Sequence, residues 1–85
     1  MTKFETGKMY YAYNTTDTVE YIRIDKRTDQ TVVVTLLARP DDPHSIDCTF
    51  RVKIREGTGC EWLLLNDGWG TCCDAADAVY EEVSA

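Results

Sequence analysis

The segment 47–56 alternates apolar and basic side chains, and this alternation is the strongest constraint that the sequence places on the fold. Phe50, Val52 and Ile54 occupy every second position, and the residues between them are basic. Successive side chains of a strand point to opposite faces, so a period of two is typical of a strand with one buried and one wet face. The chain is therefore expected to be built on a β-sheet.

Five further segments have the composition of strands, and turn-forming residues separate them. The segment 31–38 is β-branched and apolar on both faces in its middle, which predicts a central strand. Gly, Asn, Asp and Pro mark the connections, and the two prolines of the loop 39–45 keep that loop out of a sheet interior. The other strands are expected at 8–13, 18–26, 60–65 and, as a short last strand, 69–73.

The end of the chain has the pattern of a short helix. Asp74 can cap its first turn, and Ala75, Ala78, Val79 and Val83 then fall on one helical face. A single 3₁₀ turn over 74–78 fits the same residues. The sequence therefore predicts a short C-terminal helix after the last strand.

The chain is expected to be one domain, residues 1–85, because a sequence of this length supports only one compact core. The predicted fold class is mainly β, with the short C-terminal helix. The architecture is either a small SH3-like barrel or a strongly bent antiparallel sheet of five to six strands. Closing the sheet into a barrel removes exposed edges.

The cysteines Cys48, Cys60, Cys72 and Cys73 are expected to be free thiols, buried or half-buried. None of them forms the Cys-x-x-Cys pair of a zinc site, and His44, the single histidine, has no spacing relation to them. Cys72 and Cys73 are neighbours, so they should point to opposite faces of a strand. A metal site is the alternative interpretation, but no metal and no cofactor are expected.

The first residues lack the apolar stretch of a signal peptide, and no segment approaches the roughly 18 apolar residues of a membrane span. A cytoplasmic protein that does not contact the membrane is therefore expected. Catalysis needs a nucleophile with a base, a tuned carboxylate pair or a metal. The sequence offers none of these in a recognisable arrangement, which predicts that the protein is not an enzyme.

Charge is distributed unevenly along the chain. Residues 1–55 hold all nine basic residues and eight acidic ones, a net of +1, whereas residues 56–85 hold seven acidic and no basic residues. A segment of one sign repels nucleic acid and attracts basic partners. Spaced carboxylates can also imitate the phosphates of a nucleic acid, or they can form a solvated rim around the last strand and helix. The acidic residues predicted to contact a partner are Asp67, Asp74, Asp77, Glu81 and Glu82.

Tyrosine and tryptophan are more frequent than one small core requires, and both are enriched at protein–protein hot spots. Tyr10, Tyr11 and Tyr13 are predicted to contribute to partner binding. Tyr10 and Tyr11 face opposite ways on a strand, so at least one should reach the surface. The alternative is that these rings fill the ends of the barrel.

The basic stripe has two interpretations. Arg51, Lys53 and Arg55, joined by Arg23 of a neighbouring strand, could bind phosphates as part of a small nucleic-acid-binding barrel. They could equally form a solvated face with cross-strand ion pairs. The net charge of −6 opposes a nucleic-acid ligand, so direct nucleic-acid binding is the less favoured function.

Several motifs together resemble a known class of small proteins. They are Phe4-Glu5-Thr6-Gly7-Lys8-Met9-Tyr10, Lys26-Arg27-Thr28, Arg51-Val52-Lys53-Ile54 and Gly59-Cys60-Glu61-Trp62. The run resembles accessory proteins carried by phages, plasmids and other mobile elements of Firmicutes. By analogy of size and charge, the resemblance implies an anti-CRISPR protein: a stoichiometric inhibitor that binds a Cas effector or another nucleic-acid-handling complex.

Overall fold

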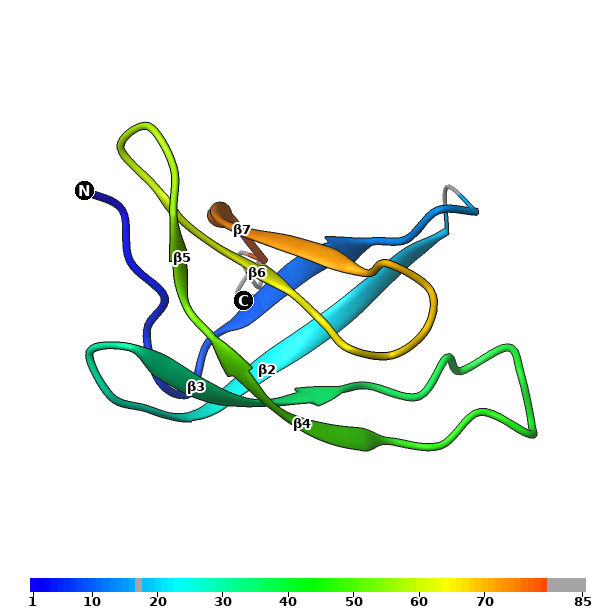
Figure 1. The fold of residues 1–85 in the computed structure, drawn as a ribbon. Coiled ribbons are helices and arrows are strands. Elements are labelled where there is room, and N and C mark those ends of the chain that lie inside the picture. The colour runs from blue at the N-terminus through cyan, green and yellow to red at the C-terminus, as the bar shows by residue number, and fades with distance from the viewer. Residues whose placement is uncertain (17, 80–85) are drawn as a thin grey trace, which may run out of the picture.

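The computed structural model describes residues 1–16 and 18–79, and it contains a single sheet of seven antiparallel strands (Figure 1). No helix occurs among the described residues. The order of the strands across the sheet is β4-β3-β2-β1-β7-β6-β5. The strands are β1 (Met9–Tyr13), β2 (Val19–Arg27), β3 (Thr31–Leu36), β4 (Cys48–Lys53), β5 (Arg55–Glu56), β6 (Glu61–Leu64) and β7 (Cys72–Ala78).

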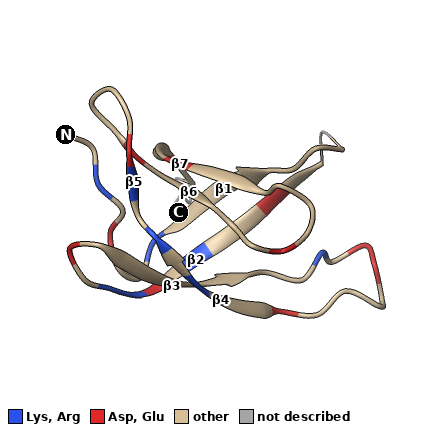
Figure 2. Ribbon diagram, viewed as in Figure 1, with Lys and Arg blue, Asp and Glu red and all other residues tan. Residues whose placement is uncertain are grey.

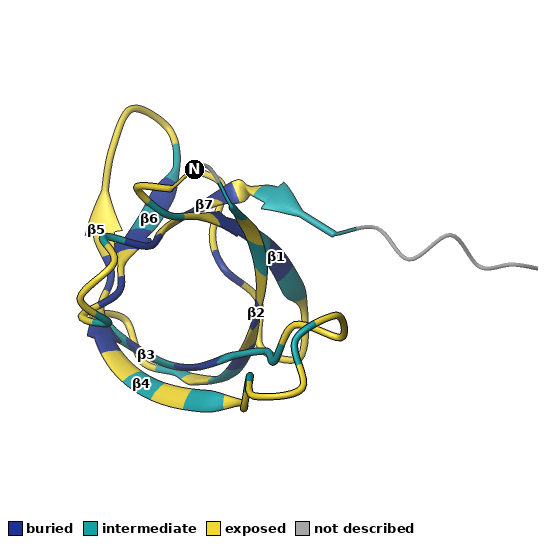
Figure 3. Cartoon of the chain, turned by 90° about the vertical axis from the view of Figure 1, so that its right-hand side faces the viewer, coloured by how far each residue is buried: buried dark blue, intermediate teal, exposed yellow. Residues whose placement is uncertain are grey.

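The sheet curls into a nearly closed, barrel-like ring (Figure 3). Its two end strands, β4 and β5, follow one another in the chain with only Ile54 between them, and β4 also comes close to β6. The bend at Ile54 thus carries the chain from one end of the sheet to the other. Within the described part of the chain, no strand pairs with the outer edge of β4.

The interior of the barrel is filled by the apolar positions that the alternation predicted. Ile22, Ile24, Val52 and Ile54 all point inward, which confirms the mainly β prediction and the inner face predicted for 47–56. The buried apolar residues are Phe4, Tyr10, Ala12, Ile22, Ile24, Val32, Val34, Val52, Ile54, Leu63, Leu65, Cys73 and Ala75.

A register shift between Ile24 and Lys26 changes which side chains of β2 face the interior. Lys26 is exposed, although strict alternation would place it on the inner face, and Arg27 turns inward instead. A bulge inserts one extra residue and reverses the faces beyond it. The bulge therefore brings a guanidinium toward the core.

Arg27 pairs with the buried carboxylate of Glu61 and so joins β2 to β6. Its Nη1 donates to Glu61 Oε1 at 2.7 Å and its Nη2 to Oε2 at 3.0 Å. The Phe4 N–H also donates to Glu61 Oε1, at 2.8 Å, and the Phe4 carbonyl accepts from Arg27 Nη1. The hydrogen bond from Arg27 lowers the pKa of Glu61 against the effect of burial. This pair fixes the N-terminal segment against the barrel.

The prediction of a helix beginning at Asp74 is wrong, because residues 72–78 form the strand β7. The strand pairs with β1 on one side and β6 on the other, and Cys73 and Ala75 face the core. Two ladders of hydrogen bonds outweigh the helical propensity of the alanines, since tertiary context overrides a weak local preference. Val83 and the rest of the predicted helix beyond residue 79 lie outside the described residues.

All four cysteines are free thiols. Cys73 is buried, and Cys48 and Cys60 are half-buried, as expected. Cys72 is exposed, which corrects the prediction for that residue but confirms that the two neighbours point to opposite faces.

Candidate interaction surface

Aromatic and apolar side chains form a continuous belt on the outside of four adjacent strands. Tyr11 lies opposite Tyr21 in the ladder of β1 and β2, and Tyr13 lies opposite both Val19 and Cys72. Directly opposed side chains on one face are close enough to touch. We call this belt the aromatic face; it consists of Tyr11, Tyr13, Val19, Tyr21, Trp62, Leu64 and Cys72.

The aromatic face is open to solvent. Tyr13 is 45% exposed, and Val19, Tyr21 and Leu64 are exposed to a similar degree. The rings of Tyr11 and Tyr21 lie 5.4 Å apart, so they stiffen one another without leaving the surface. Single exposed apolar residues are common, but a contiguous exposed patch marks an interaction site.

Carboxylates border the aromatic face at a shallow hollow of about 210 Å³. None of the described residues that line this hollow is Lys or Arg. Asp74 is exposed and accepts a hydrogen bond from the Cys60 thiol at 2.6 Å. We call this feature the acidic hollow; its lining residues are Tyr13, Trp62, Cys72, Cys73, Asp74 and Asp77.

The structure separates the five predicted acidic contacts. Asp74 and Asp77 meet in the acidic hollow beside Tyr13. Asp67 instead holds the turn between β6 and β7, where it accepts hydrogen bonds from the Trp69 N–H and from the hydroxyl and N–H of Thr71. Burial alone would raise the pKa of Asp67, but these donors outweigh it and the pKa is lowered.

Asp67 therefore has a structural role in this turn. Glu81 and Glu82 lie outside the described residues.

The three tyrosines predicted to bind a partner also differ in where they lie. Tyr11 and Tyr13 belong to the aromatic face, but Tyr10 is 1% exposed and packs edge-on against Phe4 with the ring centroids 4.8 Å apart. Its hydroxyl accepts a hydrogen bond from the Glu5 N–H at 2.8 Å. Tyr10 is thus a core residue and not available to a partner, as strand alternation requires when Tyr11 faces outward.

Six of the nine basic residues lie on β2, β4 and β5, and the others lie in the N-terminal segment and in the loop after β3 (Figure 2). Arg51 and Lys53 are exposed on β4, and Arg51 lines a hollow of about 190 Å³ together with Lys26. Arg23 is engaged elsewhere, since its Nε donates to Asp25 at 2.8 Å. Arg55 lies over the Trp62 ring, 5.3 Å from its centroid.

The predicted set of four is therefore dispersed. Arg51 and Lys53 remain together, whereas Arg23 has a carboxylate partner and Arg55 has an aromatic one. Lys26, which the β2 bulge brings to the outer face, was not predicted. Only knowledge of the register shift could have identified it, because strict alternation points it inward.

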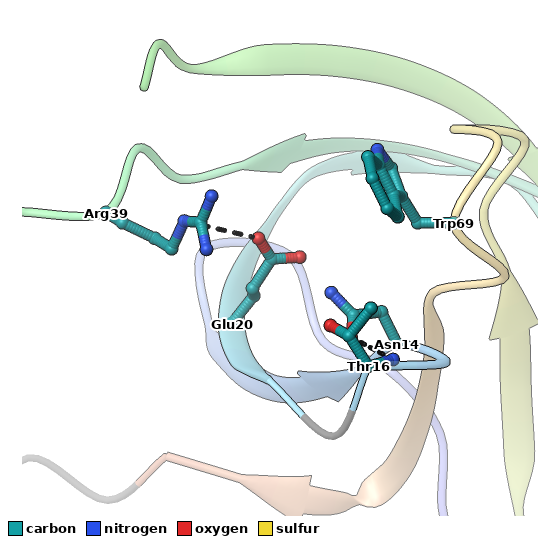
Figure 4. Close-up of a pocket in the computed structure, with 5 residues that line it drawn as sticks. All are labelled: Asn14, Thr16, Glu20, Arg39 and Trp69. Carbon is teal, nitrogen blue, oxygen red and sulfur yellow. Dashed lines mark hydrogen bonds and ion pairs between the residues drawn. The ribbon is translucent and has the colours of Figure 1, made fainter. Parts of the chain in front are cut away.

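A second group of residues surrounds a pocket of about 270 Å³ where the turns β1–β2 and β6–β7 meet the loop after β3 (Figure 4). Asn14, Thr16, Glu20, Arg39 and Trp69 line this pocket. Trp69 is 60% exposed, the most exposed aromatic side chain among the described residues. Sequence reasoning did not assemble this group, because its members come from segments distant in the chain.

The described residues contain no group of three or more His, Cys, Asp or Glu side chains placed to hold a metal ion. Within the same residues, no helix is long and apolar enough to cross a membrane. No family model, curated protein sequence or solved structure matches this chain.

Proposed function

We propose that this protein is a stoichiometric inhibitor that docks the aromatic face and the acidic hollow onto the basic surface of a nucleic-acid-handling complex, such as a CRISPR–Cas effector. The observation that carries the proposal is the meeting of Tyr13, Trp62, Asp74 and Asp77 in one hollow whose described lining residues include no Lys or Arg. A partner that binds nucleic acid presents Lys and Arg, and those cations would find carboxylates here.

The two features have different roles in binding. Exposed tyrosine and tryptophan supply apolar contact area at low cost in side-chain entropy, and such residues dominate the energy of protein interfaces. The carboxylates of Asp74 and Asp77 steer a basic partner toward the surface and exclude acidic ones. Binding by this mechanism weakens as salt is added, because salt screens the charges.

The proposal extends to the setting in which the inhibitor acts. A protein of a mobile genetic element that blocks a nuclease of its host works in the cytoplasm, where its target is. A compact scaffold suits that role, and we propose that the barrel-like sheet is an SH3-like barrel in which β4 and β5 are one strand bent at Ile54. The adjacency of these two strands in the chain, at opposite ends of one sheet, supports this description.

The test is a target-cleavage assay with reconstituted Cas effectors and increasing amounts of the protein. Inhibition should saturate at one inhibitor per effector. The double variant Asp74→Lys/Asp77→Lys should weaken inhibition at least tenfold, because it places cations where the partner has its own. The matched control is Asp29→Lys/Asp41→Lys, which makes the same change in net charge at two exposed residues outside the hollow.

If the control loses inhibition as strongly as the hollow variant, net charge alone explains the effect and the proposed surface is wrong. Circular dichroism of both variants reports whether the fold survives. Tyr13→Ala then tests the aromatic contribution, and it should reduce inhibition without changing its salt dependence.

Nucleic-acid binding is the second candidate function, and the exposed pair Arg51 and Lys53 beside Lys26 favours it. A gel shift at low salt with single-stranded and duplex probes tests it directly. Binding that falls steeply with salt and disappears in Arg51→Ala/Lys53→Ala would support this function over inhibition. The absence of any shift at low salt would eliminate it.

A further inference from the structure

The pocket of Figure 4 combines a recessed carboxylate with an exposed indole. Glu20 belongs to β2, while Trp69 belongs to the turn between β6 and β7. The volume of about 270 Å³ is below the range of drug-sized sites and suits a single side chain or a small ion.

Glu20 has hydrogen-bonding capacity that the described residues do not use. Its side chain is only 12% exposed, yet among the described residues its side chain makes one polar contact, an ion pair in which Arg39 Nε lies 3.9 Å from Oε1. That distance is too long for a hydrogen bond. In Figure 4 the carboxylate lies between Arg39 on one side and Trp69 and Asn14 on the other, so one oxygen faces the pocket.

Arg39 does not neutralise this region. Its guanidinium is shared with Asp42, whose Oδ2 lies 3.5 Å from Nη2. Among the described residues here, two carboxylates and one guanidinium leave one negative charge in excess, and the whole chain adds to it with a net charge of −6. The pocket is therefore suited to a cation and not to an anion.

Trp69 is held in place by its backbone. Its carbonyl accepts hydrogen bonds from the N–H and the Oγ1 of Thr15, at 3.2 and 3.0 Å, and its N–H donates to Asp67 at 2.9 Å. The turn is thus fixed from two sides while the ring remains 60% exposed. Because the turn that carries the ring is already fixed, little conformational entropy of the protein is lost when a ligand stacks on the indole.

We infer that this pocket binds the guanidinium of an arginine side chain, with Glu20 as its counter-ion and the Trp69 ring as its stacking surface. A planar guanidinium matches a carboxylate through two parallel N–H groups and stacks on an aromatic face, and tryptophan is the strongest ring for this interaction. The site lies outside the acidic hollow. It rests on the proposed function only for the origin of the arginine, which would be an anchor residue of the basic partner.

The probe is N-acetylarginine amide, titrated into the ¹⁵N-labelled protein and followed by NMR. The indole N–H of Trp69 and the backbone N–H of Glu20 should shift and saturate, with a dissociation constant of about 1 mM for so small a contact. N-acetylcitrulline amide has the same shape without the charge, and it should cause no saturable shift. The indole N–H of Trp62 serves as an internal reference for effects outside the pocket.

Two variants test the roles of the two residues. Glu20→Gln keeps the shape of the side chain and removes its charge, so affinity should fall about tenfold or more. Trp69→Leu removes the ring and should lower affinity about threefold. Glu56→Gln removes an exposed carboxylate of β5 and should leave the titration unchanged. The spectrum of each variant without ligand reports whether its fold is intact.

Equal shifts with the citrulline probe, or an unchanged affinity in folded Glu20→Gln, would overturn the inference. So would a saturable response of the Trp69 indole to inorganic phosphate in place of the arginine probe. The outcome of this titration can be distinguished from the outcome of the cleavage assay. Arginine binding without inhibition of any effector would contradict only the proposed function, and inhibition without arginine binding only this inference.

Discussion

The pair formed by Glu61 and Arg27 is the most consequential contact at the scale of single residues. The Glu61 carboxylate is buried, and it accepts hydrogen bonds from Arg27 and from the Phe4 N–H. Removing one partner of a buried pair leaves the other charge buried without a partner. This costs about 3–5 kcal/mol when both residues are fully buried. Arg27 is 18% exposed, so the cost here should be smaller than for a fully buried pair.

We predict that Glu61→Gln lowers the free energy of unfolding by about 2–3 kcal/mol. Urea denaturation followed by tryptophan fluorescence measures this loss. It is a large fraction of the total, since a domain of this size is stable by roughly 4–13 kcal/mol. Glu56→Gln, at an exposed position, should change stability by less than about 0.5 kcal/mol. Equal midpoints for Glu61→Gln and the wild type would show that the pair adds nothing.

The same pair predicts a dependence of stability on pH. The pKa of Glu61 is lower in the folded state than its ordinary value, so its stabilising effect is complete above the unfolded pKa of about 4.3 and is lost as the pH falls through the folded pKa. The stability difference between the wild type and Glu61→Gln should therefore shrink as the pH is lowered below about 4. A difference that stays constant down to the acid transition would contradict this account.

Tyr10 separates a structural role from a binding one. Its ring lies in the core and its hydroxyl accepts one backbone hydrogen bond. Tyr10→Phe should cost about 1 kcal/mol of stability and leave inhibition in the cleavage assay unchanged. Tyr13→Ala should do the reverse. A loss of inhibition in folded Tyr10→Phe would mean that Tyr10 reaches the partner after all.

The turn between β6 and β7 shows how a local conformation is set at the scale of an element. Gly68 and Gly70 have φ of +81° and +66°, a region that side chains rarely adopt. A Cβ on Gly68 would meet open space, whereas one on Gly70 would lie 3.1 Å from Thr15 Cγ2. The two glycines therefore differ in crowding and not in backbone strain.

Gly70→Ala should destabilise the protein by about 1–2 kcal/mol, and Gly68→Ala by about 1 kcal/mol. Thr15→Ser removes the crowding methyl group but keeps the hydroxyl that donates to Trp69. The double variant Thr15→Ser/Gly70→Ala should thus be less destabilised than the sum of the single variants. Thermal melts measure each difference. Strict additivity would show that Thr15 and residue 70 do not touch.

Local patterns identified most elements, and their failures have physical causes. The alternation in 47–56 and the β-branched run in 31–38 predicted the strands there, since each pattern reflects a face that the barrel buries. β7 was missed at 74–78 because three alanines favour a helix locally, and only pairing with β1 and β6 makes the segment a strand. No pattern in the sequence predicted the bulge in β2.

The candidate surfaces were only partly predictable for the same reason. Asp74, Asp77 and Tyr13 were singled out from the sequence, but strand pairing alone brings them together with Trp62. Alternation showed that Tyr10 and Tyr11 face opposite ways without showing which one is buried. Glu20 and Trp69 are far apart in the chain, and the curl of the sheet places them in one pocket.

The four free thiols probe the whole molecule, because they range from exposed to buried in one cooperative fold. Cys72 is exposed and should react with a thiol reagent within seconds to minutes. Cys73 is buried, and burial, with the charges of Asp77 and Asp74, holds the pKa of its thiol well above the ordinary value. The thiolate is the reactive form, so Cys73 should react only when the barrel opens.

Mass spectrometry after timed labelling tests this order. Cys72 should be modified first, Cys48 and Cys60 later, and Cys73 last, at a rate that rises with urea as global unfolding does. Modification of Cys73 as fast as that of Cys72 would show that β7 separates from the barrel without global unfolding.

The open outer edge of β4 has a consequence for how copies of this protein meet. An unpaired strand edge is a template on which another chain can add, and growth of such pairs leads to aggregates. Arg51 and Lys53 project from that edge strand, and Arg51 lies opposite Val33 of the β-branched strand β3. Two copies that met edge to edge would bring their cations together, and like charges directly opposite destabilise the pairing.

Replacing Arg51 and Lys53 by threonine would leave the fold in place and remove that repulsion. The variant should scatter light and bind an amyloid dye at concentrations where the wild type remains clear. We therefore expect Arg51 and Lys53 to keep the open edge of β4 from pairing with a second copy, whether or not they bind any ligand.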